Sequence, residues 1–248
     1  METYFHIPME FDQARFDAVV EQTVRSGGKG YVCAAESNNI TVANTDPAFG
    51  EVFRNSLLNN CDGSVVALFL SRIHDKNLQP YICADIFAKY IRSGKYRHFF
   101  LGNSPEITGA LRERLLREVP ELEGMRFEPL PYCDVEEFDY EGIAKMLNAD
   151  APDIVWVSLG APKQEMFMSR LLPLLDRGVL FGVGAVFNFY AGVGKVRRAP
   201  RWMRRLRLEW LHRALEEPSK NIPRYWGFIR ILPRLIREER KKLLTLRR

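Results

Sequence analysis

The sequence predicts an α/β protein in which a parallel sheet is flanked by helices and followed by a basic helical appendage. Two apolar runs, 98–103 and 153–160, are each followed by helical spacing of apolar residues, and a third run covers 179–189. The run "DIVWVSLG" is nearly all apolar, which is typical of a parallel strand buried on both faces. Strands that alternate with helices indicate a Rossmann-like parallel sheet over residues 1–195.

The helical segments carry recognisable ends. After "HFFLGN", Ser104 stands at a cap position, Pro105 at the first helical position and Glu106 in the first turn. The segment "QEMFMSRLLPLLDRG" has helical apolar spacing, and we expect its helix to end at Gly178.

Length and composition are those of a globular protein: 248 residues, 46% hydrophobic and 27% charged. No run reaches the roughly 18–20 apolar residues that span a bilayer, and the start "METYFHIPMEFDQARF" lacks the features of a signal peptide. The four cysteines do not have zinc-site spacing, so we expect reduced thiols and no metal site. They are Cys33, Cys61, Cys83 and Cys133.

Charge is distributed unevenly along the chain. Residues 195–248 contain 18 Lys/Arg and 5 Asp/Glu, a net charge of +13, which leaves −8 for the rest. From Tyr225 onward, apolar pairs recur at helical spacing between arginines and lysines. A basic amphipathic end on an acidic body favours a membrane surface or a polyanion as partner.

Polar and glycine residues follow the predicted strands, where open α/β sheets bind ligands. Each strand end also has a plainer interpretation: an ordinary turn, or for Glu165 a charge that complements the helix dipole. Gln164, with both a donor and an acceptor, suits the edge of a uracil or sugar. The candidate donor-binding residues are Gly102, Asn103, Gly160, Gln164, Glu165, Gly182, Gly184 and Asn188.

Asp62 lies in "NNCDGSVV", where Asp-Gly before an apolar run most often forms a turn or a helix cap. The functional alternative is a carboxylate that acts as general base at the end of a strand or helix. Spacing alone favours the turn.

A set of motifs occurs in a specific order: "GAPKQE", "GVGAVFNFYAG", "RRAP" with "RWM", "LEW" with "LHR", and "EP" followed by "RY". Together with "DPAFGEVFRNSLLNNCDGSVV" they resemble the WecG/TagA/CpsF family of bacterial glycosyltransferases over most of residues 30–226. The resemblance implies inverting, metal-independent transfer of an N-acetylmannosamine-type sugar, without a cofactor. The implied donor is a UDP-sugar, and the implied acceptor is a sugar on a polyprenyl diphosphate, in cell-surface polysaccharide biosynthesis.

The resemblance also implies roles for residues. Asp62 matches the catalytic carboxylate, and Gly160, Gln164, Gly184 and Asn188 match positions that line the donor pocket. Residues 196–248, the appendage, are expected to close over the site and to associate with the cytoplasmic face of the membrane as a peripheral protein. The cations expected to bind diphosphate are Arg198, Arg213, Lys220 and Arg224; we expect Arg201, Arg204 and Arg205 to face lipid headgroups or solvent.

The sequence departs from the family pattern at several positions. The family usually has threonine at Ala34, asparagine at Glu36, arginine at Pro80, aspartate at Asn188 and glycine at Arg207. Lys220 and Pro223 replace arginines in the appendage. The changes at Ala34, Glu36, Pro80 and Asn188 touch the expected donor pocket. We therefore predict an active transferase with altered donor specificity.

Two other functions compete with this interpretation. An Arg/Trp-rich appendage could bind nucleic acid, although the acidic body and the helical apolar pairs argue against it. A non-catalytic membrane scaffold is the second alternative, and the retained Asp62 argues against it. A homo-oligomer is compatible with the sequence, which does not define the oligomeric state.

Overall fold

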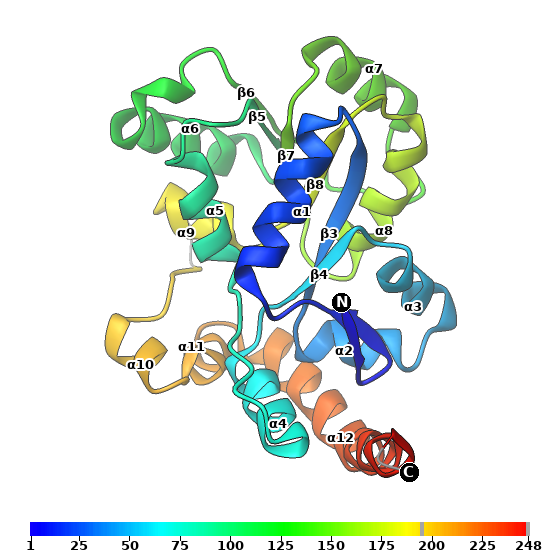
Figure 1. The fold of residues 1–248 in the computed structure, drawn as a ribbon. Coiled ribbons are helices and arrows are strands. Elements are labelled where there is room, and N and C mark those ends of the chain that lie inside the picture. The colour runs from blue at the N-terminus through cyan, green and yellow to red at the C-terminus, as the bar shows by residue number, and fades with distance from the viewer. Residues whose placement is uncertain (194–195, 247–248) are drawn as a thin grey trace.

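A computed structural model describes residues 1–193 and 196–246 and contains a six-stranded, wholly parallel sheet (Figure 1). The strand order is β4-β3-β8-β7-β5-β6. This confirms the predicted α/β class with a parallel, Rossmann-like sheet flanked by helices. The sheet strands are β3 (Lys29–Ala35), β4 (Leu58–Cys61), β5 (His98–Gly102), β6 (Arg126–Glu128), β7 (Ile154–Ser158) and β8 (Gly178–Gly182); β1 (Glu2–Tyr4) and β2 (Ile7–Met9) form a separate antiparallel hairpin.

Helices cover both faces of the sheet, because successive strand residues point to opposite sides. On β7, Ile154 and Trp156 join the core under one layer, while Val155 and Val157 join the core under the other. The first layer contains α1 (Gln13–Arg25), α5 (Cys83–Ile91), α6 (Pro105–Glu118) and α9 (Val186–Ala191). The second contains α2 (Ser37–Ala43), α3 (Pro47–Arg54), α4 (Ser64–His74), α7 (Tyr140–Asp150) and α8 (Lys163–Leu171).

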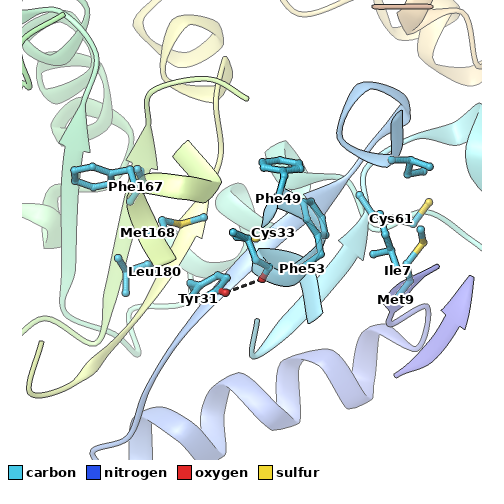
Figure 2. Close-up of a cluster of buried hydrophobic side chains, with 14 of the residues drawn as sticks. Ile7, Met9, Tyr31, Cys33, Phe49, Phe53, Cys61, Phe167, Met168 and Leu180 are labelled. Carbon is cyan, nitrogen blue, oxygen red and sulfur yellow. Dashed lines mark hydrogen bonds between the residues drawn. The ribbon is translucent and has the colours of Figure 1, made fainter. Parts of the chain in front are cut away.

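The second core is shown in Figure 2, where side chains of α3 and α8 meet those of the sheet. The buried phenol of Tyr31 is satisfied locally, because its hydroxyl donates to the Val52 carbonyl at 2.6 Å. Phe49, Phe53 and Phe167 in this cluster are each at most 1% exposed. The core therefore holds the helices that follow β3, β4 and β7 firmly against the sheet.

Element ends follow local chemistry. As predicted, the Ser104 hydroxyl accepts the Ile107 N–H at 3.3 Å and Pro105 opens α6. The helix expected to reach Gly178 instead ends at Leu171, because Pro173 lies in the 3-10 turn Leu172–Leu174 that follows. A second 3-10 turn, Pro120–Leu122, follows α6. The third apolar run contains both β8 and the start of α9.

The appendage forms α10 (Arg201–Arg205), α11 (Glu209–Glu216) and the long α12 (Pro218–Leu246). In Figure 1, α12 runs beside α2 and α4 along the side of the molecule that also carries the N-terminal hairpin. Phe228 and Leu235 are buried in the same cluster as the sheet residues. The division into a core of residues 1–195 and an appendage of 196–248 stays a prediction.

Candidate active site at the carboxyl edge of the sheet

The sequence candidates gather at one edge of the sheet, the carboxyl edge, where the parallel strands end. Glu36 follows β3, Asp62 follows β4, Asn103 follows β5, Gly160 lies two residues beyond β7, and Gly184 lies two residues beyond β8. Because β4, β3, β8, β7 and β5 are neighbours in that order, residues far apart in the sequence are brought side by side.

Asp62 does not cap the helix that follows it, which is the simplest form of the turn interpretation. Gly63 is the N-cap of α4, with no side-chain hydrogen bond. Asp62 Oδ1 instead accepts the backbone N–H of Cys83, the first residue of α5, at 2.6 Å. Burial raises the pKa of Asp62 to about 7; Glu36 and Glu209 add to the rise, while the Cys83 N–H and Arg213 oppose it. A carboxyl group with this pKa can both hold and release a proton at neutral pH.

A second carboxyl group, Glu165, lies on α8 and is fully buried. Its Oε1 accepts Nδ2 of Asn39 at 3.1 Å and Nε2 of Gln164 at 2.9 Å, while Oε2 has no hydrogen-bond partner among the described residues. Burial raises the pKa of Glu165 to about 7, against these hydrogen bonds. Glu165 therefore joins the start of α2 to the start of α8 from inside the protein.

Gln164 continues this network and is itself only 3% exposed. Its Oε1 accepts the Gly184 N–H at 2.9 Å, while its Nε2 donates to Glu165. Gly182 is packed beneath it, since a Cβ there would lie 3.0 Å from Gln164 Nε2 and 2.8 Å from Met168 Cε. The amide of Gln164 thus holds the loop after β8 against α8.

The network extends across the other strands. Ser158, the last residue of β7, donates its hydroxyl to the Gly184 carbonyl at 2.7 Å. Asn103 Nδ2 donates to Ser158 Oγ and to Asn188 Oδ1, each at 3.1 Å. Gly102 has a φ of +101°, and a Cβ there would lie 2.8 Å from the Ser158 carbonyl oxygen, so only glycine fits. Side chains therefore fasten the ends of β3, β5, β7 and β8 to one another.

Two cations of the appendage reach this edge. The Arg213 guanidinium on α11 lies over the Phe189 ring at 5.4 Å and lowers the pKa of Asp62. Arg224 on α12 donates through Nη2 to the Ala161 carbonyl, in the loop after β7, at 3.0 Å. The α11 and α12 helices thus bring positive charge to both sides of the strand ends.

The other two candidate cations are engaged elsewhere. Arg198 donates to Asp85 Oδ1 at 2.6 Å, in the first turn of α5 and two residues beyond the amide that binds Asp62. Lys220 is exposed and pairs with Glu217, at 3.3 Å to Oε1. Arg198 is therefore brought close to the Cys83 amide that binds Asp62, whereas Lys220 is not brought into the network.

The departures from the family pattern occupy informative places. Glu36 caps α2, its carboxylate accepting the N–H groups of Asn38 and Asn39 at 2.9 and 3.0 Å. The carbonyl of Ala34 accepts Asn39 Nδ2 at 2.9 Å. Arg207 has a φ of +60°, which explains why glycine is favoured there. Pro80 lies in the segment before α5, and no contact of the structure gives it a role.

Sequence reasoning missed Asn39, Ser158 and the Cys83 amide. Asn39 lies in "VCAAESNN", three residues beyond Glu36, and Ser158 is the polar end of an apolar strand. Both residues could have been found from the sequence, since a polar side chain at or shortly after the end of a buried strand requires a hydrogen-bond partner. The Cys83 amide could not, because a backbone donor is invisible in a sequence.

Other features of the described residues bear on ligands. Within 1–193 and 196–246, no group of three or more His, Cys, Asp or Glu side chains could hold a metal ion. None of the helices in those ranges is both long and apolar enough to cross a bilayer. Two shallow hollows, of about 460 and 400 Å³, lie along α12 and where α12 meets the α2–α3 connection, away from the carboxyl edge.

Several known proteins are similar to this chain. The chain is 32% identical over 173 residues to an N-acetylglucosaminyldiphosphoundecaprenol N-acetyl-β-D-mannosaminyltransferase of Bacillus spizizenii, a match that covers 66% of this chain and 64% of the relative. The Bacillus subtilis protein of that name is 31% identical with the same coverage, and that of Staphylococcus aureus is 25% identical over 75% of this chain and 71% of its own length. Residues 5–244 match the family described as "Glycosyl transferase WecG/TagA/CpsF family", and the chain therefore belongs to the WecG/TagA/CpsF family.

Proposed function

We propose that this protein is an inverting glycosyltransferase that moves an N-acetylmannosamine-type or related sugar from a UDP-sugar to a sugar on a polyprenyl diphosphate. Family membership and the names of the relatives support the class of reaction. The observation that carries the proposal is the state of Asp62. This residue follows β4, burial raises the pKa of its carboxyl group to about 7, and the charge of Arg213 acts against that rise.

In this proposal Asp62 is the general base. It takes the proton from the acceptor hydroxyl as that oxygen attacks the anomeric carbon. The new bond forms on the face opposite the bond to UDP, which breaks in the same step, so the configuration inverts. The hydrogen bond from the Cys83 amide fixes the carboxylate while leaving it basic enough to act near neutral pH.

The leaving diphosphate develops negative charge that must be neutralised. Arg213 and Arg224 are the appendage cations at the carboxyl edge, and we assign them to this task. Arg198, which binds Asp85 near the Asp62 site, is assigned a supporting role, and Lys220, which pairs with Glu217, is assigned none. The guanidinium group suits phosphate oxygens because its donors form a planar fork. We propose that these cations act in place of a metal ion, which predicts full activity in the presence of EDTA.

We assign the donor pocket to the strand-end loops, with Gly102, Asn103, Gly160, Gly182, Gly184 and Asn188 beside the donor and Gln164 and Glu165 beneath them. Glu36 and Ala34 would contact or shape the sugar site, and we propose that they alter the specificity for the donor sugar. We propose that the appendage, through its basic residues and the apolar residues between them, binds the anionic cytoplasmic surface of the membrane, where the lipid-linked acceptor lies.

The decisive test compares wild type with Asp62→Asn in an assay of UDP release from UDP-N-acetylmannosamine and related donors, with a polyprenyl-diphosphate-linked N-acetylglucosamine. We expect the variant to lose about 10²–10⁴-fold in kcat, the usual contribution of a general base. Equal rates for the two proteins would refute the assignment of Asp62.

Two further outcomes would favour the competing functions. Absence of turnover with every donor, together with binding to anionic vesicles, would support a membrane scaffold. Binding to random oligonucleotides in preference to those vesicles would support a nucleic-acid-binding protein.

A further inference from the structure

Glu239 is a buried carboxylate in the C-terminal half of a helix that is otherwise rich in exposed cations. It is 4% exposed. Its Oε2 accepts the Phe5 N–H at 2.8 Å, and its Oε1 lies 3.2 Å from His74 Nε2 and 3.2 Å from Lys242 Nζ. A carboxylate is costly to remove from water unless donors face it. The Phe5 amide and Lys242 Nζ donate to Glu239, and His74 lies beside it, so these partners fix its position.

These four residues, which we call the Glu239 cluster, join three distant segments. Phe5 lies in the turn between β1 and β2, and His74 is the last residue of α4. Lys242 also donates to the Thr3 carbonyl of the hairpin. The cluster therefore fastens the C-terminal half of α12 to the hairpin and to α4.

The far end of α2 is attached at the same place. Asn44, the C-cap of α2, donates Nδ2 to the Phe5 carbonyl at 3.0 Å, and its own carbonyl accepts Arg234 of α12 at 3.3 Å. Both peptide groups on either side of the Phe5 α-carbon are thereby engaged, one by Glu239 and one by α2.

The opposite ends of the same three helices lie at the carboxyl edge. Glu36 caps α2, Asp62 lies two residues before α4, and Arg224 of α12 binds the loop after β7. At 1.5 Å per residue, α4 spans about 16 Å and the stretch of α12 from Arg224 to Glu239 about 22 Å. In Figure 1, α12 runs beside both α2 and α4, so the three helices form a frame between the cluster and the edge.

Pro233 weakens the backbone of α12 between its two points of attachment. It lies inside α12 between Arg224 and Glu239 and has no N–H, so one helical hydrogen bond is missing there. Because the helix backbone has one hydrogen bond fewer at this point, contacts with other elements add to the forces that set the direction of its C-terminal half.

We propose that Glu239 is a positioning residue, which closes the frame of α2, α4 and α12 and so holds Glu36, Asp62 and Arg224 in register at the carboxyl edge. Glu239 touches no substrate and acts through the three helices. The roles of Asp62 and Arg224 rest on the proposed function; the mechanical coupling does not.

The test compares Glu239→Ala and Glu239→Gln with Glu238→Gln in the full-length protein. Glu238 is the matched control, because it is the adjacent carboxylate, is exposed, and lies 3.5 Å from His6 and 4.0 Å from Arg234. Hydrogen exchange is followed segment by segment, and kcat and KM are measured by UDP release.

We expect Glu239→Ala to increase exchange about tenfold in the edge-proximal segments 36–40, 62–67 and 213–224, while β5 and β7 keep wild-type protection. Because misplacement of reacting groups by about 1 Å can lower rates up to a hundredfold, kcat should fall about tenfold. Glu239→Gln should show the same changes to a smaller extent, and Glu238→Gln should stay within about twofold of wild type.

Increased exchange confined to the cluster itself, with wild-type kcat, would overturn the proposal. Equal loss of protection in β5 and β7 for both Glu239 variants would also overturn it, because Glu239 would then support stability in general. If the wild type shows no transfer, the proposed function fails, while exchange at the three edge-proximal segments still decides whether the coupling exists.

Discussion

The carboxyl edge and the appendage both contribute residues to the candidate site, but different kinds of contact hold those residues in place. At the edge, buried amide, hydroxyl and carboxyl groups bind one another, from Asn39 through Glu165 and Gln164 to Gly184. In the appendage, Arg213 and Arg224 bring charge to the edge, the first over the Phe189 ring and the second through a hydrogen bond to the Ala161 carbonyl. The difference indicates that the edge supplies fixed geometry, whereas the guanidinium groups of Arg213 and Arg224, carried to the edge by α11 and α12, supply charge that can turn toward a ligand.

The two regions should therefore respond differently to substitution. A buried polar group that loses its partner costs about 1–3 kcal/mol, so changes at the edge should lower stability. An arginine at or near the surface contributes about 0–1 kcal/mol to stability, so substitution of Arg213 or Arg224 should spare the fold and affect turnover.

The largest effect is expected from the double variant Arg213→Ala/Arg224→Ala. Removal of the charges that face the leaving diphosphate should lower kcat by about 10²–10³-fold, the usual loss when a transition-state donor is removed. The melting temperature should change little. UDP release with a water-soluble, short-chain acceptor measures kcat without a contribution from membrane binding.

Arg230→Ala is the matched control, an exposed arginine on the same helix as Arg224. It should stay within about twofold of wild type, since an isolated surface charge acts weakly on a distant site. If the control loses as much activity as the double variant, net charge matters and the two arginines have no specific role.

The pH dependence of kcat should show the next largest effect. A general base must be ionised, and the pKa of Asp62 is raised to about 7. The rate should therefore rise about tenfold per pH unit at pH values below about 6.5, and level off above about pH 7.5. Arg213 lowers the pKa of Asp62, so Arg213→Ala should move this limb to higher pH. A limb that Arg213→Ala leaves unmoved would show that the two groups do not interact.

The sequence predicted the elements that depend on local chemistry. The Ser104 cap, the buried strand 154–158 and the clustering of strand-end residues all follow from residue type and spacing, and the structure has them. The sequence did not predict which distant residues bind each other. Asn39 binds Glu165, 126 positions away, and Arg198 binds Asp85, 113 positions away. Such contacts depend on strand order, which alternating periodicity does not determine.

The smallest effect tests the buried carboxyl group of Glu165. Its pKa is raised to about 7 from an ordinary value of 4.5, so the folded protein holds a proton that the unfolded chain releases. The folded state therefore loses stability as the pH rises from about 4.5 to about 7. The side chain in Glu165→Gln is neutral at every pH. The free energy of unfolding of this variant, relative to that of the wild type, should therefore increase by about 2 kcal/mol from about pH 5 to about pH 8. Urea denaturation at the two pH values measures this gain.

Glu106→Gln is the control that separates burial from a helix-dipole effect, because Glu106 also lies in the first turn of a helix after a strand but is exposed. At about pH 8, Glu106→Gln should have a free energy of unfolding about 0.3–1 kcal/mol lower than that of the wild type, since an ionised carboxylate stabilises a helix N-terminus. The two substitutions thus have opposite signs at high pH. If Glu165→Gln also favoured the wild type there, Glu165 would act as an ordinary helix-end charge, and the carboxyl edge would depend on charge in the same way as the appendage.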